Sequence, residues 1–269
     1  MMAIKILTKG EIMNTYPSNL NNEQMNILVP LIPVPSTGRA LKWKMADIIN
    51  AIFYIVRTGC PWRYLPSDFP PWQTVYYHFR KLKKCGIWKK IHDTLMKLTR
   101  ISSGRKPEPS AGIIDSQSVK ASMYTSEKGY DAGKKVNGIK RHILTDTMGL
   151  IIAVIIHIAS IQDRDGAKLL LSLVSDRLPR MRLIWADAGY AGKLIGWVLT
   201  HCQWVLQVVR RPSGTKGFKL LPRRWVVERT FGWLGFSRRL SKDYERLAET
   251  GESVIYISMI SLMLRRLAP

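Results

Sequence analysis

Two apolar segments in the second half of the chain each end at an aspartate. Residues 111–115 read AGIID and residues 182–187 read RLIWAD. Short apolar runs that stop at polar residues are typical of buried strands. Residues 138–145 and 150–159 are also strand-like, and the sequence Asp146-Thr147-Met148-Gly149 between them favours a hairpin turn. The pattern predicts three consecutive antiparallel strands, with residues 116–120 continuing the first, and a later strand that again ends at an acid.

Alternating helices and strands follow the hairpin. Helices are predicted over residues 167–173, over 195–200 and from about Arg223, with a strand at 204–209. Asp165 is the expected N-cap of the first helix, because Gly166-Ala167 and an apolar run follow it. The order β-β-β-α-β-α-β-α predicts an α/β fold, a ribonuclease-H-like mixed sheet with flanking helices.

In a ribonuclease-H-like layout, acids at the ends of the first and fourth strands meet an acid from the last helix. Here these residues are Asp115, Asp187 and Glu228. Three adjacent carboxylates repel one another without a cation, and their oxygen atoms suit Mg²⁺ or Mn²⁺. Two such ions, about 3.5–4 Å apart, serve phosphodiester transfer. The alternative roles are structural: a turn residue at Asp115, a helix N-cap at Asp187, and at Glu228 an exposed charge paired with Arg224.

The first half of the chain predicts a small all-α, helix-turn-helix-like bundle. Helical patterns cover residues 22–31, 41–56, 71–84 and 87–98, and Gly59 and Pro61 end the second. The third helix mixes aromatic and polar residues and ends in a basic cluster, as a groove-reading helix does. Its candidate base-reading residues are Gln73, Thr74 and Tyr77, and its candidate phosphate-binding residues are Arg80, Lys81, Lys83 and Lys84. In the alternative interpretation, Val75, Tyr76, Phe79 and Leu82 are core residues and the lysines form a solvated helix end.

Charge and composition narrow the class of partner. The chain carries 42 Lys and Arg against 19 Asp and Glu, a formal net charge of +23, so double-stranded DNA is the expected partner. The three cysteines and five histidines lack the spacing of a zinc site. No apolar run approaches the ~20 residues that span a bilayer, so we expect no membrane partner and a cytoplasmic protein.

A polar stretch with two prolines, residues 102–110, predicts a linker. We expect an N-terminal extension over residues 1–19, a helical DNA-binding domain over 20–101 and a catalytic domain over 111–269.

Several longer motifs occur along the chain in one order. They are GCPWRYLP (59–66), WQTVY (72–76), IDSQSVK (114–120), GYDAGKK (129–135), QDRDGA (162–167), ADAGY (186–190) and WVVERTF (225–231). In these motifs the chain resembles the bacterial insertion-sequence transposases of the DDE class, in particular the insertion-sequence-five family within the wider insertion-sequence-four superfamily. The resemblance implies that Asp115, Asp187 and Glu228 are a metal-binding catalytic triad. The intervals between these acids leave no room for a large inserted domain.

The wider group has a signature of Tyr, Arg, Glu and Lys around the last acid. Arg224 and Glu228 match this signature, whereas Leu221 and Gly235 stand at its tyrosine and lysine positions. If the last helix continues past Gly235, Arg239 lies about three turns beyond Glu228 on the same face and replaces the missing phosphate contact.

Basic residues of the second half are further candidates for DNA contact. They are Lys120, Lys135, Lys140, Arg141, Arg224, Arg229, Arg238 and Arg239. Around the second strand, an exposed hairpin edge protected by charge is the alternative.

The resemblance implies a DNA transposase that binds the terminal inverted repeats of an insertion sequence, hydrolyses phosphodiester bonds at the element ends and joins the 3′-hydroxyl ends to target DNA. Because two ends must be joined together, we expect a homodimer or larger assembly on DNA. Two alternatives stay open: a catalytically silent DNA-binding repressor derived from a transposase, and a ribonuclease-H-like nuclease that cuts without joining.

Overall fold

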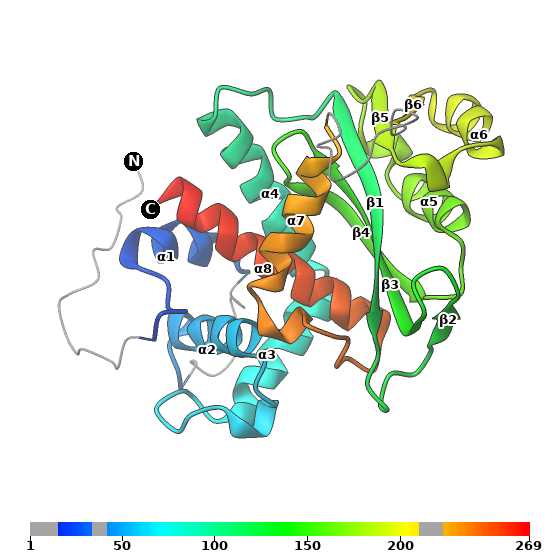
Figure 1. The fold of residues 1–269 in the computed structure, drawn as a ribbon. Coiled ribbons are helices and arrows are strands. Elements are labelled where there is room, and N and C mark those ends of the chain that lie inside the picture. Colours follow the sequence, from blue (N-terminus) through cyan, green and yellow to red (C-terminus); the bar gives the residue numbers. More distant parts are fainter. Residues whose placement is uncertain (1–15, 34–41, 210–222) are drawn as a thin grey trace.

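Figure 1 shows the arrangement of helices and strands in the computed structural model, which describes residues 16–33, 42–209 and 223–269. The α-helices are α1 (Asn22–Leu28), α2 (Met45–Thr58), α3 (Trp72–Lys84), α4 (Ile87–Ser102), α5 (Asp163–Ser172), α6 (Lys193–Cys202), α7 (Trp225–Gly235) and α8 (Ala248–Leu267). The strands are β1 (Ala111–Lys120), β2 (Gly129–Asp131), β3 (Val136–Asp146), β4 (Ile151–Ile158), β5 (Leu183–Ala186) and β6 (Val205–Val208). Short 3-10 helices are η1 (Val29–Leu31), η2 (Trp62–Tyr64), η3 (Ser175–Arg177), η4 (Ala188–Tyr190) and η5 (Arg238–Leu240). Each helix and strand predicted from the sequence is confirmed within a few residues, and β2 is an additional strand.

The helical half owes its shape to sharp stops between amphipathic helices. Helix α2 ends at Gly59, whose φ of +75° favours glycine, and a Cβ there would lie 3.0 Å from the backbone of Arg238. Helix α3 follows Pro71 and buries Val75, Phe79 and other apolar residues on one face. These helices do not close a core alone, because α8 packs against α1, α2 and α4.

The sheet has the strand order β2-β3-β1-β5-β6, and β4 also pairs with β3. Strand β3 is antiparallel to both β1 and β4, whereas β5 is parallel to both β1 and β6. Asp146 makes the predicted β3–β4 turn, since its Oδ1 accepts the N–H groups of Met148 and Leu150 at 2.8 Å each. The mixed sheet with flanking helices confirms the predicted fold class.

Helices cover both faces of the sheet. Helix α5 packs against β1, β3 and β4, and α6 against β6, whereas α7 contacts β1 and α8 contacts β4 on the opposite face (Figure 1). Apolar side chains from both halves, such as Ile49 of α2 and Ile143 of β3, belong to one continuous hydrophobic cluster. The predicted boundary at residues 102–110 therefore lies between two parts that share one hydrophobic core. The division of the chain into domains at this boundary stays a prediction. Within the described ranges, no helix is long and apolar enough to cross a membrane.

Three local predictions are wrong. Helix α5 already begins at Asp163, because the carbonyl of Gln162 accepts the N–H groups of Asp165 and Gly166, so Asp165 is not the N-cap. Strand β3 is not an exposed edge, since it is paired on both sides. Helix α7 ends at Gly235 and the backbone is extended at Ser237, so the helical-wheel argument for Arg239 fails. Leu41 and Leu221 lie outside the described residues.

Candidate active site

Strand register explains why two acids far apart in sequence meet. Strands β1 and β5 are parallel neighbours, with Ile113 paired to Trp185. Two residues further along each strand stand Asp115, inside β1, and Asp187, directly after β5. Because residues two apart in a strand share a face, the two carboxylates lie level with each other at the same place on the sheet.

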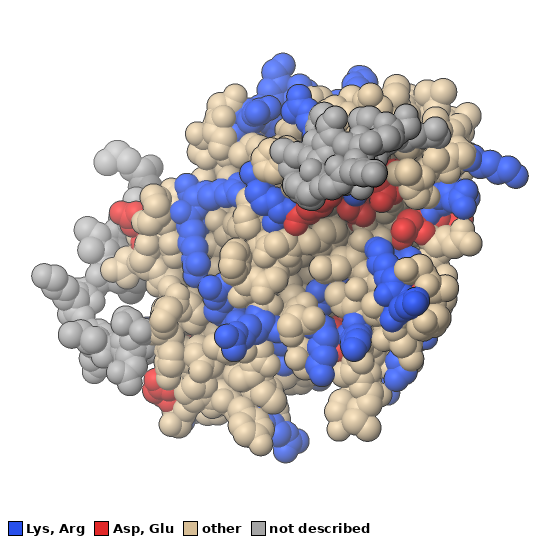
Figure 2. Space-filling view, in the orientation of Figure 1, with Lys and Arg blue, Asp and Glu red and all other residues tan. Residues whose placement is uncertain are grey.

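Helix α7 brings the third acid to this place. It packs against β1, and Glu228 lies in its first turn. Arg224, directly before the helix, places its Nη2 3.9 Å from Asp115 Oδ2, 3.7 Å from Asp187 Oδ2 and 3.6 Å from Glu228 Oε1. Figure 2 shows a patch of acidic side chains on this face with Lys and Arg around it. The three predicted acids therefore surround one cationic nitrogen.

The carboxylates differ in their exposure to solvent. The Asp115 side chain is 17% exposed, whereas those of Asp187 and Glu228 are 34% and 50% exposed. Burial raises the pKa of Asp115 to about 6, and the Asp187 carboxylate adds to this rise, while the Ser116 N–H and Arg224 oppose it. The site thus has a buried carboxylate at its base and an open side formed by the other two.

The carboxylate oxygens of the three acids are ligands that hard divalent cations prefer. Within residues 16–33, 42–209 and 223–269, no three His, Cys, Asp or Glu side chains lie close enough together to bind one ion. The three acids instead lie around Arg224, whose Nη2 is within 4 Å of an oxygen of each. Their all-oxygen donor set suits Mg²⁺ or Mn²⁺.

The structural alternatives for two acids are also realised. Asp187 caps η4, because its Oδ1 accepts the N–H of Gly189 at 2.8 Å. Glu228 pairs with Arg224 four residues before it. These contacts hold the carboxylates at the shared site and are compatible with it.

A buried polar chain that the sequence analysis missed lies beneath the acids. The Tyr190 hydroxyl is 2.9 Å from His142 Nε2, and His142 Nδ1 is 3.4 Å from His157 Nε2. Burial lowers the pKa of His142 to about 3, so both histidines are neutral and the tyrosine donates to His142. Gly166 is required beside them, since a Cβ would lie 2.5 Å from His142 Nδ1. The spacing of His142 and His157 across the predicted hairpin was the available sequence signal.

A second network joins β1, β3 and α5 next to Asp115. Ser116 Oγ donates to Asp163 Oδ1 at 2.7 Å, and Lys140 Nζ lies 3.0 Å from the same oxygen. Lys134 Nζ donates to the Ser116 carbonyl at 3.0 Å. Asp163 is therefore held by the Ser116 hydroxyl and the Lys140 cation beside the three-acid site.

Helix α3 presents both of the faces that the sequence allowed. Its buried face includes Val75, Phe79 and Leu82. The opposite face lines a groove of about 990 Å³, whose walls include Gln73, Tyr77, Arg80, Lys81, Lys83 and Lys84. Thr74 is half-buried and is not among the lining residues. Val75, Phe79 and Leu82 are therefore core residues as in the alternative interpretation, whereas Tyr76 is half-buried and lines the groove beside the basic residues.

The remaining basic residues that were predicted to contact DNA differ in how far they are exposed to solvent. Lys120, Lys135 and Arg238 are exposed, and Arg224 and Arg229 are half-buried. Lys140 and Arg141 are only 4% and 2% exposed, and Arg141 Nη1 donates to the Leu240 carbonyl at 2.6 Å. Arg239 is also buried and its Nε donates to Glu245 at 2.7 Å. These last three side chains bind protein groups, so we do not place them on a DNA-contacting surface.

Comparison with known proteins gives a consistent result. Residues 106–264, more than half of the chain, match the family described as "Transposase DDE domain", and residues 20–92 match "Putative transposase of IS4/5 family". The chain is 33% identical over 119 residues to a putative transposase for insertion sequence element IS402 of Burkholderia cepacia, a match covering 42% of this chain and 56% of that protein. It is 24% identical over 109 residues to an uncharacterized 16.2 kDa protein of the same element, covering 38% of this chain and 73% of that protein. The chain thus spans just over half the length of the first of these relatives.

Members of the DDE family generally use divalent metal ions and act on DNA, in agreement with the oxygen-rich site described above. The chain belongs to the DDE transposases, in the IS4/5 group.

Proposed function

We propose that this transposase binds the terminal inverted repeats of its insertion sequence, hydrolyses phosphodiester bonds at the element ends and joins the resulting 3′-hydroxyl ends to target DNA. The observation that carries this proposal is the arrangement of Asp115, Asp187 and Glu228 around one guanidinium nitrogen, Nη2 of Arg224. Carboxylates from two strands and a helix gather here in a chain of strong positive charge. Such a gathering is explained by a need to hold cations against a polyanion.

Asp115, Asp187 and Glu228 would hold two Mg²⁺ or Mn²⁺ ions. When bound, such a pair supplies a Lewis acid for the attacking oxygen and another for the leaving oxygen. Asp115 offers its oxygen from the buried base of the site, and Asp187 is held in place by the Gly189 N–H. Arg224 shields the mutual repulsion of the three carboxylates, and its guanidinium can turn to a phosphate oxygen once other cations take its place.

The DNA surface that we propose combines α3 with basic residues around the acids. Gln73 and Tyr77 lie on the exposed face of α3 and are placed to read bases, with the half-buried Thr74 beside them. The phosphate contacts that we propose are Arg80, Lys81, Lys83, Lys84, Lys120, Lys135, Arg224, Arg229 and Arg238. Because transposition joins two element ends, we propose that the active assembly on DNA is a homodimer or larger.

Two competing functions predict different products. A catalytically silent repressor would bind the terminal repeats without cutting them. A nuclease that lacks strand transfer would release nicked DNA and never yield joined products. The three acids are present and gathered, which favours the active transposase over the repressor.

The test is cleavage and joining of a duplex that carries the element's terminal repeat, in Mg²⁺, by wild type, Glu228→Gln and Glu127→Gln. Glu127 is an exposed glutamate outside the site and serves as the matched control. We expect cut and joined products from wild type and the control, and binding without cutting from Glu228→Gln. Binding without cutting by all three proteins would favour the repressor, and cut products that are never joined would favour the simple nuclease.

A further inference from the structure

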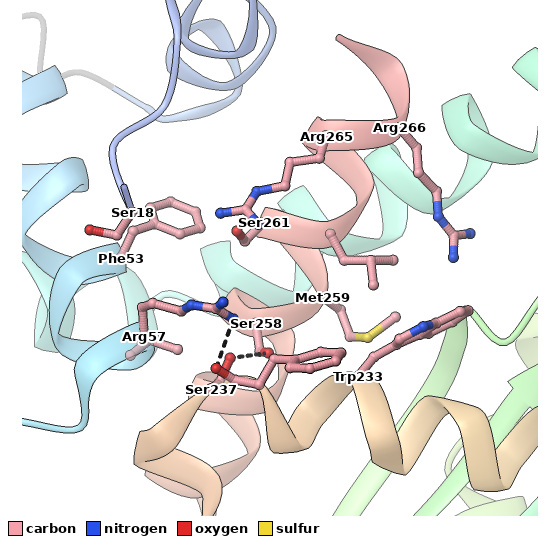
Figure 3. A pocket seen from close by; sticks show the side chains of 13 residues that line it. Ser18, Phe53, Arg57, Trp233, Ser237, Ser258, Met259, Ser261, Arg265 and Arg266 are labelled. Atoms are coloured by element: carbon pink, nitrogen blue, oxygen red, sulfur yellow. Dashed lines mark hydrogen bonds between the residues drawn. The ribbon is translucent and has the colours of Figure 1, made fainter. Parts of the chain in front are cut away.

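A cavity lies beyond the C-terminal half of α7, away from the acids. Its volume is about 330 Å³, and it is lined by residues of α2, α7 and α8 and by Ser18. Figure 3 shows Arg57 of α2 and Arg265 and Arg266 of α8 around this cavity, with Trp233 of α7 at its floor. A cavity of this size holds a small polar group, such as one phosphodiester with its sugar.

The positive charge of the cavity is not balanced by the protein. The ion pairs formed within the described ranges include none of Arg57, Arg229, Arg265 and Arg266. Among the described residues, Arg57 Nη1 donates to the Phe236 carbonyl at 2.7 Å, and Arg229 Nη2 to the Met148 carbonyl at 3.0 Å. Burial, together with the nearby Arg229, lowers the pKa of Arg266, while the Asp146 carboxylate opposes this change. The nearest carboxylate, Asp146, is already paired with Arg100, so the arginines at the cavity remain able to bind an anion from outside the chain.

A buried polar atom at the cavity also lacks a partner. Ser18 is 6% exposed, and its Oγ has no hydrogen-bond partner among the described residues. Buried hydroxyl groups are rarely left unpaired, because the lost hydrogen bond costs free energy. Ser18 thus leaves an unpaired polar atom at the edge of the cavity whose arginines form no ion pair within the described ranges.

Tryptophans on α7 hold two of the guanidinium groups. Trp225, Arg229 and Trp233 follow one another at every fourth residue, and the Arg229 guanidinium lies 4.5 Å from the centre of each ring. Arg266 stacks 4.7 Å from the centre of the Trp233 ring. A guanidinium that stacks through its face keeps its N–H edge free for bidentate bonds to phosphate oxygens. Because two guanidiniums already stack on Trp233, the cavity suits a phosphate better than a base.

We propose that this cavity binds the phosphodiester backbone of a DNA strand that runs along α7 from the three acids. The proposal rests on the proposed DNA function and specifies where a strand leaves the site. From Trp225 to Trp233 the helix rises about 12 Å, the length of three to four nucleotides of a strand. Arg57, Arg265 and Arg266 donate to the phosphate, so one strand bridges the helical half and the catalytic half.

The test uses the salt dependence of binding to a fluorescent random-sequence duplex of about 30 base pairs in EDTA, since each phosphate contact contributes roughly 0.9 to the slope of log K against log salt. Arg265→Gln/Arg266→Gln is compared with Lys168→Gln/Lys193→Gln, which removes two charges from α5 and α6. We expect the arginine variant to reduce the slope by up to about 0.9, the value for one phosphate, and the lysine control to leave it unchanged. An unchanged slope in the arginine variant, or an equal reduction in the control, would overturn the site.

A second double variant separates loss of the binding site from a folding defect. Arg265→Lys/Arg266→Lys keeps the charge but loses the planar, stacked donors, so we expect a wild-type slope with several-fold weaker binding. Wild-type affinity in this variant would contradict the proposal. A wild-type protein that binds no DNA would instead reject the proposed function, so the two failures are distinguishable.

Discussion

A buried ion pair ties the end of α4 to the β3–β4 turn, and breaking it should destabilise the whole molecule. Arg100 Nη1 donates to Asp146 Oδ2, and the two residues are 5% and 0% exposed. The β3–β4 turn also contacts α7, because Thr230 Oγ1 donates to the Gly149 carbonyl at 2.9 Å. The pair therefore connects the helical half, the sheet and the helix that carries Glu228.

Asp146→Asn isolates the charge from the turn. An asparagine keeps the Oδ1 acceptor that receives the Met148 and Leu150 N–H groups, so the turn is retained, while the carboxylate charge and the Oδ2 acceptor of the Arg100 hydrogen bond are both lost. Removing one partner of a buried pair leaves an uncompensated charge and costs about 3–5 kcal/mol. Because Arg100 Nε keeps its bond to the Lys106 carbonyl, we expect the lower end, about 3 kcal/mol.

The assay is urea unfolding followed by tryptophan fluorescence and circular dichroism, for Asp146→Asn, Arg100→Met and the double variant. The double variant contains neither charge of this pair, so its loss of stability should be at least about 2 kcal/mol smaller than the sum of the two single losses. Strictly additive costs, or a loss below about 1 kcal/mol in Asp146→Asn, would refute the claim that a buried charge pair joins these elements.

Three further predictions concern the site and its support. Burial lowers the pKa of His142 to about 3, so below about pH 6.5 the unfolded chain binds a proton that the native chain does not. The free energy of unfolding should therefore fall as the pH drops below 6.5, and His142→Asn should reduce this slope by about 1.4 kcal/mol per pH unit. An unchanged slope in chemical unfolding would contradict a neutral, buried His142. Gly166→Ala should lower the free energy of unfolding by about 1–3 kcal/mol, because the new methyl meets His142 and His157 at 2.5 and 2.6 Å, and a variant as stable as wild type would disprove this close packing. Mg²⁺ should raise the melting temperature of the wild type and EDTA should reverse the rise, while Asp187→Asn should show neither effect; a Mg²⁺ response retained by that variant would argue against Asp187 as a ligand.

The sequence predicted the elements well because their periodicities are local. The apolar runs before Asp115 and Asp187 and the turn at Asp146 specify strands and a hairpin without reference to distant residues. Acid spacing and element order predicted Asp115, Asp187 and Glu228, and an oxygen of each lies within 4 Å of Arg224 Nη2. The parallel register of β1 and β5, which brings the first two together, required the structure.

Long-range partners account for what the sequence could not predict. Lys140 and Arg141 look like surface charges, yet β3 is internal and their side chains meet Asp163 and the Leu240 carbonyl from distant segments. The continuation of α7 past Gly235 was equally open, because a glycine allows a helix to end without requiring it to do so. The position of Arg224 between all three acids depends on packing of α7 against β1.

Helix α8 has a consequence for the order in which the chain folds during synthesis. It packs against α1, α2 and α4, and Gln24 Nε2 donates to the Ala268 carbonyl at 2.8 Å. The first helices therefore emerge from the ribosome long before their apolar partner exists. A nascent or truncated chain lacking residues 248–267 would expose these apolar faces, so a premature stop should produce a target for chaperones and proteases rather than a free-standing DNA-binding fragment.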